Sequence, residues 1–412
     1  MHTGEIIRFY REKTGLTQSQ LGEGICTTTH VSKIERGKTA YSDEIISLFS
    51  ERLGIDIHHE IEAHHLLEQQ LHLWHNSIIM RRMNLVEKFK SQLEKSAFLE
   101  SSKYSTYYHL LRARYYILHQ KADAASSILD SINRGNLPAF ETNLFHHVQG
   151  VIYINRNSYE NQQKAIHVLQ KIDMNDYQIR ECYYHLSIAY HCVGNKVMAY
   201  FYAEKALGYF KKTNNYLGSI KAESLMLLQL SDENHLIERY RNLIEDCDSL
   251  GFLEQKGMLL NNLGYEYYNR CDFASASRCF KEALTLAEKG SVTYLGRLCN
   301  YTDACMEGEL CSDKELEKQI HLGLQLSKKL KSSLFLKLFD LFSLQKNQCR
   351  DEYICYLENE ALPHFLETKN LLLIERYGKV LYEHYVEREQ LDRAILLTRQ
   401  LEACRLRTLS IK

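Results

Sequence analysis

The chain has 412 residues, of which 45% are hydrophobic and 25% are charged, as in an ordinary folded protein with a water-exposed surface. Its formal net charge is −1, which excludes a molecule that binds nucleic acid through its overall charge, so any such surface must be local. Pro138 and Pro363 are the only prolines, and this scarcity favours an almost entirely helical chain.

The first sixty residues predict a cluster of short helices. A helix over 6–13 is followed by helices that Thr17 and Thr27 cap, and by a fourth over 42–53. Gly15, at a position suited to positive φ, is expected to end the first helix, and Gly24, Gly37 and Gly54 are expected to end the helices that follow. In the fourth helix, the residues expected to be buried are Ile45, Ile46, Leu48 and Phe49.

Only a few residues, 24–26, join the second and third helices. This is the helix-turn-helix arrangement, in which the second helix of the pair enters the major groove of DNA. Three motifs, Leu16-Thr17-Gln18-Ser19-Gln20-Leu21, Val31-Ser32-Lys33-Ile34-Glu35-Arg36-Gly37 and Leu53-Gly54-Ile55, resemble the phage-repressor (Cro/cI, or XRE) class over about residues 4–58. An inert helical domain that makes protein contacts is the alternative.

The resemblance implies roles for individual residues. Gln18 is expected to bond a backbone phosphate, and Arg36 and Lys38 to lie near phosphates at the end of the recognition helix. The residues expected on the side of that helix facing the bases are Thr28, Thr29 and Lys33, and Thr27 and Ser32 complete the expected DNA-binding set. Glu35 is expected to be structural and to pair with Arg11.

The charge of this segment limits how tightly one copy can bind. Residues 1–56 hold seven Lys or Arg and eight Asp or Glu, and short threonine side chains discriminate weakly between bases. We therefore expect a homodimer, or a higher homo-oligomer, that places two copies on two half-sites of double-stranded DNA.

Residues 56–95 have a helical pattern and contain six histidines: His58, His59, His64, His65, His72 and His75. On a helix, His58, His65 and His72 share a face but lie about 10 Å apart, so only His72 and His75 could share one metal ion. No pattern of carboxylates or thiols completes a site. We therefore predict a helical linker over 59–98 between a DNA-binding domain over 1–58 and a repeat domain over 99–412, with no bound metal.

Beyond residue 100 the chain repeats itself. In four places a tyrosine is followed nine residues later by an alanine: Tyr115 and Ala124, Tyr190 and Ala199, Tyr267 and Ala276, Tyr385 and Ala394. The tyrosines are spaced at multiples of 38–39 residues, which predicts about eight helix pairs similar to the tetratricopeptide repeat. The expected fold is all-α: a helix-turn-helix domain followed by a right-handed superhelical array of helical hairpins.

Such an array has a concave groove lined by the first helix of each pair. Asparagine donates and accepts hydrogen bonds at once, so a row of asparagines can grip the backbone of an extended peptide. The residues expected to face the groove and bind such a ligand are Asn155, Tyr184, His191, Asn261, Tyr265, Asn269 and Asn300. The alternative is that they are merely exposed polar side chains.

The two parts together resemble the Rap/Rgg/NprR/PlcR/PrgX family of peptide-sensing regulators of Gram-positive bacteria, and the length favours an NprR-like member. The resemblance implies a transcription regulator whose groove binds a short signalling peptide, with a change in oligomeric state or domain placement. Two alternatives remain: a Rap-like protein that acts on a response regulator of a phosphorelay, and a phage or plasmid repressor without a peptide.

The sequence points to no catalytic centre and to no cofactor. It contains no Gly-rich phosphate loop, no GxSxG and no HExxH, so we do not expect an enzyme. The 12 cysteines form no CxxC pair and favour small buried side chains in a reducing compartment. No apolar signal core or bilayer-long apolar run occurs, so we expect a cytoplasmic protein with no membrane partner.

Overall fold

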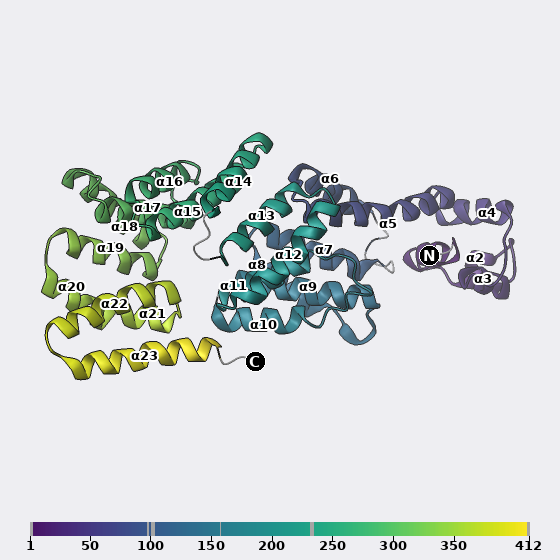
Figure 1. The fold of residues 1–412 in the computed structure, drawn as a ribbon. Coiled ribbons are helices and arrows are strands. Elements are labelled where there is room, and N and C mark those ends of the chain that lie inside the picture. Colours follow the sequence, from purple (N-terminus) through teal and green to yellow (C-terminus); the bar gives the residue numbers. More distant parts are fainter. Residues whose placement is uncertain (1–2, 97–98, 100–103, 157, 231–234, 410–412) are drawn as a thin grey trace. The chain divides into compact units, whose positions relative to one another are not determined.

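The computed structural model describes residues 3–96, 99, 104–156, 158–230 and 235–409, and every regular element in these ranges is helical, which confirms the predicted all-α fold (Figure 1). The chain divides into two compact units, residues 1–156 with 168–178, and residues 157–167 with 179–412. Within the described ranges no helix combines the length and the apolar character needed to cross a bilayer.

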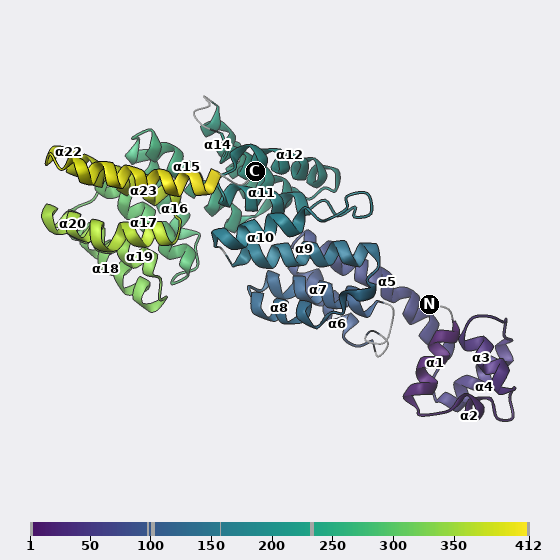
Figure 2. The same cartoon turned by 90° about the horizontal axis from the view of Figure 1, so that it is seen from below.

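Four short helices form the N-terminal cluster around one apolar core; they are α1 (Thr3–Lys13), α2 (Gln18–Gly22), α3 (Thr28–Glu35) and α4 (Asp43–Leu53) (Figure 2). The predicted caps are present: Thr17 and Gln20 form a capping box, and the Thr27 hydroxyl accepts a hydrogen bond from the backbone N–H of His30. The four predicted glycines all have positive φ, as the ends of these helices require.

One predicted core residue of this cluster is wrong. Leu48 is 40% exposed, whereas Ile46, Phe49 and Leu53 are buried. Leu48 lies about 200° round the helix from Ile46, because each residue of an α-helix turns by ~100°. The apolar pattern of α4 therefore contains one side chain on the solvent face.

The expected linker is a packed helix pair, α5 (Ile57–Ile79) and α6 (Met83–Leu93). The start of α5 belongs to the N-terminal cluster, since Ile57 is fully buried in its core and the Tyr10 hydroxyl donates to Glu60 at 2.6 Å. Further along α5, Trp74 stacks on Tyr108 of α7 (Ser105–Leu118) with ring centroids 5.8 Å apart. A single helix thus packs on the N-terminal cluster at one end and on the first repeat helices at the other.

The histidines of α5 lie in different environments. Both ring nitrogens of buried His75 are used, because Nε2 accepts from Arg114 at 2.9 Å and Nδ1 lies 3.0 Å from the Tyr107 hydroxyl. The Tyr107 hydroxyl also lies 3.4 Å from Nδ1 of His72. His75 therefore takes part in packing α5 on α7. The side chains of His64 and His65 lie outside the described part of the structure.

The repeat helices of the first unit follow α6. After α7 come α8 (Ala122–Ser131), the short 3₁₀ helix η1 (Arg134–Asn136), α9 (Ala139–Asn155) and α10 (Tyr159–Leu169), whose last residues belong to this unit. The predicted small residue Ala124 is only partly buried, and its neighbour Ala125 is fully buried instead. The alanine opposite Tyr115 is therefore displaced by one residue from the repeat pattern.

The second unit continues the array of helix pairs. Its helices are α11 (Cys182–Cys192), α12 (Lys196–Lys212), α13 (Tyr216–Leu227), α14 (Leu236–Leu250), α15 (Leu253–Asn269), α16 (Phe273–Thr285), α17 (Val292–Glu307), α18 (Asp313–Lys329), α19 (Ser333–Lys346), α20 (Arg350–Tyr356), the π-turn η2 (Leu357–Ala361), α21 (Leu362–Glu367), α22 (Leu371–Glu387) and α23 (Leu391–Leu409). The predicted alanines Ala199, Ala276 and Ala394 are buried between helices.

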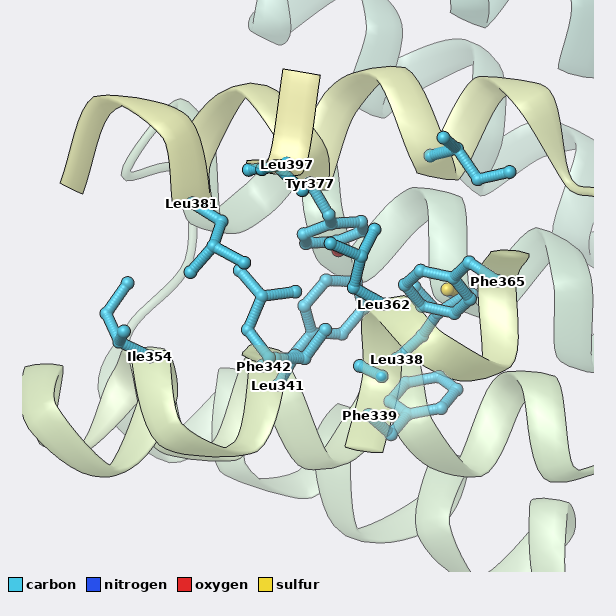
Figure 3. Packing of buried hydrophobic residues seen from close by; sticks show 14 of the residues in the cluster. Leu338, Phe339, Leu341, Phe342, Ile354, Leu362, Phe365, Tyr377, Leu381 and Leu397 are labelled. Atoms are coloured by element: carbon cyan, nitrogen blue, oxygen red, sulfur yellow. The ribbon is translucent and has the colours of Figure 1, made fainter. Parts of the chain in front are cut away.

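The last three helix pairs share one large core. Figure 3 shows its side chains converging from α19, α20, α21, α22 and α23. Phe339, Phe365 and Leu357 are fully buried there. The helix that starts at Arg350 passes through the π-turn η2 immediately before Pro363, and π-turns and prolines are the usual places where a helix changes direction.

Candidate DNA-binding face and ligand groove

The solvent-facing side of α3 carries the predicted DNA-binding residues. Thr28, Thr29, Lys33 and Arg36 are exposed and Ser32 is half-buried, at the spacing that places side chains on one face of a helix. The opposite side holds Val31 and Ile34, both fully buried in the core of the cluster. Short hydroxyl side chains near the N-terminus of α3 leave room for close approach of a ligand to its backbone.

A buried charge network fixes α3 against α1 and α2. Glu35 accepts from Nε of Arg11 at 2.6 Å and from Nη2 at 3.2 Å, which confirms the predicted pair. Gln18 donates from its amide nitrogen to the same carboxylate at 2.8 Å. The hydrogen bond that Arg11 donates to Glu35 raises the pKa of Arg11. A primary amide carries two N–H groups, so Gln18 has a second donor for a phosphate.

Five of the seven basic residues of the cluster form two groups. Arg8 and Arg11 lie in ion pairs with Glu12 and Glu35, at 2.9 Å and 2.6 Å. Lys33 and Lys38 are exposed, and Arg36 is exposed while it donates to the backbone carbonyl of Ser32 at 3.1 Å. Of the other two, Lys13 of α1 is exposed with its Nζ over the Phe9 and Tyr10 rings, and Arg52 donates to the carbonyl of Leu21 at 2.9 Å. Three exposed cations, Lys33, Arg36 and Lys38, therefore lie along α3 or just after it.

Three of the predicted ligand-binding residues form one hydrogen-bonded chain across α15 and α17. The Tyr265 hydroxyl donates to Oδ1 of Asn300, and Nδ2 of Asn300 donates to Oδ1 of Asn261, both at 2.8 Å. Tyr265 is 43% exposed, yet desolvation by the surrounding protein raises the pKa of its hydroxyl.

A charged pair lies on the same face of α17 as Asn300, because Asp303 follows Asn300 by three residues. Arg376 of α22 and Asp303 of α17 form a bidentate pair, with Nη2 of Arg376 2.8 Å from Oδ1. The guanidinium also lies over the rings of Tyr268 and Tyr377, at 5.4 and 5.3 Å from their centroids. Burial opposes the charge of Arg376, but the bond to Asp303 outweighs it and raises the pKa of Arg376.

A cavity of about 790 Å³ opens beside this pair. Asn269, another predicted ligand-binding residue, lines it together with aromatic and apolar side chains, among them Tyr268, Phe273, Tyr353, Leu344, Ile354 and Val380. Burial raises the pKa of Tyr353 to about 12, so its hydroxyl remains a hydrogen-bond donor at neutral pH. An apolar and aromatic hollow with a few placed polar groups has the usual composition of a ligand site.

The other three predicted residues lie elsewhere. His191 of α11 contacts the side-chain amide of Gln229, with Nδ1 3.0 Å from Nε2. Tyr184 is partly buried, and its ring packs among apolar side chains of α12 and α13, including Phe210. Asn155 belongs to the first unit, where its amide donates to the carbonyl of Val151 at 3.0 Å.

Sequence reasoning missed the charged pair of Arg376 and Asp303. Asp303 follows Asn300 by three residues and Glu307 follows Asp303 by four, so helical spacing alone places all three on one face of α17. No local pattern connects them to Arg376, which is 73 residues beyond Asp303. That contact requires the curvature of the array, which the repeat period does not specify.

Comparison with known proteins gives three kinds of match. A helix-turn-helix family model matches residues 7–59. The transcriptional activator NprA of Geobacillus stearothermophilus is 19% identical over 395 residues, covering 90% of this chain and 95% of that protein. The apo form of the quorum sensor NprR from B. thuringiensis has a TM-score of 0.65 at 18% identity, covering 83% of this chain and 99% of NprR.

A Rap protein complexed with Competence and Sporulation Factor has a TM-score of 0.67 at 17% identity, covering 84% of this chain and 99% of that one. The class defined by the fold and the site is therefore a helix-turn-helix domain joined to a tetratricopeptide-like array. The matches with NprA, NprR and Rap confirm the resemblance to the Rap/Rgg/NprR/PlcR/PrgX family that the sequence motifs indicate.

Proposed function

We propose that this chain is a cytoplasmic, non-catalytic transcription regulator that binds double-stranded DNA through α3 and a short signalling peptide through the groove of its array. The observation that carries the DNA-binding half is the polar outer face of α3, held in a domain that matches the helix-turn-helix family. The expected contact residues on and around α3 are Gln18, Thr27, Thr28, Thr29, Ser32, Lys33, Arg36 and Lys38.

The peptide-binding half is supported by the chain of Tyr265, Asn300 and Asn261. Each asparagine still has polar groups beyond those used in the chain, and an amide that donates and accepts suits the backbone of an extended peptide. Asn269 lies at the adjoining cavity. NprR, which shares this fold, has been solved in complex with its cognate peptide NprX.

We propose that the regulator acts as a homodimer, since one helix-turn-helix domain with few available cations binds loosely and two half-sites add their contacts. A DNA-binding domain over about 1–58, the segment 59–98 and a repeat domain over 99–412 would then be the working parts. A peptide that binds one conformation of the array more tightly shifts the dimer population toward that conformation. The spacing between the two DNA-binding domains then either matches the two half-sites of the operator or does not.

The test is a gel-shift titration at fixed salt on the DNA flanking the protein's own gene, with and without synthetic peptides from the C-terminus of neighbouring small open reading frames. A shift that responds to a peptide supports the whole proposal and gives the sign of regulation. A shift that no peptide alters favours a plain repressor. No shift at any protein concentration favours the alternative in which the array acts on a response regulator.

Two double variants separate the halves of the proposal. Thr29→Ala with Lys33→Ala should abolish specific DNA binding while peptide binding and the melting temperature stay unchanged, because both side chains are exposed. Asn261→Ala with Asn269→Ala should weaken peptide binding and leave DNA binding of the unliganded protein intact. Unchanged peptide affinity in the second variant would remove these asparagines from the site.

A further inference from the structure

The cavity beside Arg376 presents a cation to its interior. Arg376 lines the cavity and its side chain is 34% exposed, whereas its partner Asp303 is not among the lining residues. The negative charge that balances the guanidinium therefore lies behind it, in the wall. Arg350 also lines the cavity, but it lies at an exposed position and pairs with Glu387 at 2.6 Å.

The guanidinium is held in place and keeps donors for a ligand. The Asp303 carboxylate accepts one hydrogen bond from each terminal nitrogen of Arg376. Three of the five N–H groups of the guanidinium are therefore not used by that carboxylate. The rings of Tyr268 and Tyr377 fix its plane. A fixed guanidinium loses little entropy when it binds a planar anion.

A carboxylate of the protein already lies at the place that a ligand carboxylate would take. Glu307, which lines the cavity, has Oε1 at 3.5 Å from Nη2 of Arg376, a distance longer than a good charge-assisted hydrogen bond. Glu307 follows Asp303 by four residues on α17 and its side chain is 35% exposed. A second carboxylate can therefore replace this weak contact without disturbing the Arg376–Asp303 pair.

We infer that the cavity is a subsite for the carboxylate group of the bound peptide, with Arg376 as its anchor, Asp303 as the residue that positions Arg376, and Glu307 as an internal competitor. The inference rests on the proposed peptide-binding function, because Asn269, one of the residues proposed to bind the peptide, lines the cavity. The carboxylate is either the C-terminus of the peptide or an Asp or Glu side chain, and both have the same chemistry.

The experiment uses affinity selection on the immobilised full-length protein with three random heptapeptide pools, read out by mass spectrometry. The first pool has a C-terminal carboxyl group and no Asp or Glu, the second is amidated but contains Asp and Glu, and the third is amidated without Asp or Glu. We expect retention of the first or the second pool to exceed that of the third by roughly ten- to a hundredfold, the range for a hydrogen bond to a charged group.

Arg376→Gln should reduce retention of the preferred pool to that of the third. Because this variant leaves the Asp303 carboxylate without its partner, the double variant Asp303→Asn with Arg376→Gln, in which both groups are neutral, should give the same loss. Glu307→Gln should increase retention of the preferred pool, since the competitor is removed. Arg350→Gln, on the same cavity, is the matched control and should change retention little.

Each outcome separates this inference from the proposed function. If the wild-type protein retains the third pool as well as the others, and Asn261→Ala with Asn269→Ala abolishes that retention, the carboxylate subsite is wrong and the peptide-binding function stands. If Glu307→Gln instead lowers retention, the cavity takes a cation and the inference fails. If the wild-type protein retains no pool, the inference fails together with the peptide-binding function.

Discussion

Glu35 shows how much of the N-terminal domain depends on one carboxylate. It is 4% exposed and accepts hydrogen bonds from Arg11 and Gln18, so it joins α1, α2 and α3. Glu35→Gln should destabilise this domain by roughly 3 kcal/mol, because breaking one partner of a buried pair leaves a charge uncompensated. Hydrogen-exchange mass spectrometry should show faster exchange in α1 and α3. Unchanged exchange there would contradict the structural role of Glu35.

Gly4 is required for a different reason, the close approach of two backbones. A Cβ built on Gly4 would lie 1.9 Å from the carbonyl oxygen of Ile34, a contact that no rotamer change can relieve. Gly4→Ala should therefore push α1 from the end of α3, lower the melting temperature and weaken DNA binding. Gly208→Ala in α12 is the control, since nothing lies within 4 Å and alanine favours helices by about 1 kcal/mol. Equal melting temperatures for the two variants would contradict this explanation.

For single helices, the sequence predicts the capping residues and the helix ends better than it predicts which side of each helix is buried. Thr17, Thr27 and the four glycines have the expected roles because capping and positive φ depend on residues within one turn. Leu48 differs from expectation because the side of a helix that is covered depends on neighbours distant in sequence. Of the candidate ligand-binding residues, Asn261, Tyr265 and Asn300 meet because α15 and α17 are the first helices of two successive helix pairs.

The packing of α5 on α7 should make stability depend on pH. Burial, and then the charges of Arg114 and His72, hold the pKa of His75 well below its usual 6.5. Below pH 6.5 the unfolded chain takes up a proton that the folded chain resists. The contribution of His75 is therefore complete above pH 6.5 and is lost below it, by up to about 1.4 kcal/mol per pH unit, until the pH reaches the depressed pKa.

The measurement is urea unfolding between pH 7.5 and 5.5, followed by the fluorescence of Trp74, the only tryptophan in the chain, which lies beside His75 in α5. The midpoint should fall with pH in the wild-type protein and fall less in His75→Gln, whose amide can still donate and accept. The same fall in both proteins would assign the pH dependence to other groups.

For the whole molecule, the repeat period predicts an array of helix pairs. It does not predict which helix pairs distant in the chain contact one another. Tyr190, Tyr267 and Tyr385 indicate helix pairs from sequence alone, because each pair in a solenoid contacts the pairs next to it in the chain. These local contacts provide most of the stability. The Arg376–Asp303 pair instead joins α22 to α17 across the helices α18 to α21. A contact of this kind depends on curvature accumulated over several pairs, and no single repeat encodes it.

The continuity of α5 gives the last prediction. This helix is buried in the N-terminal cluster at Ile57 and stacked on α7 at Trp74, so it is a stiff connection between them. Gln69 lies between these contacts and is exposed. Gln69→Pro removes a hydrogen bond in the helix interior and kinks it, at about 3 kcal/mol. We expect DNA binding and peptide binding to persist separately, while the effect of peptide on the gel shift disappears. Gln69→Ala should retain that effect. If the proline variant also retains it, the two functions are coupled by a route that does not require a straight α5.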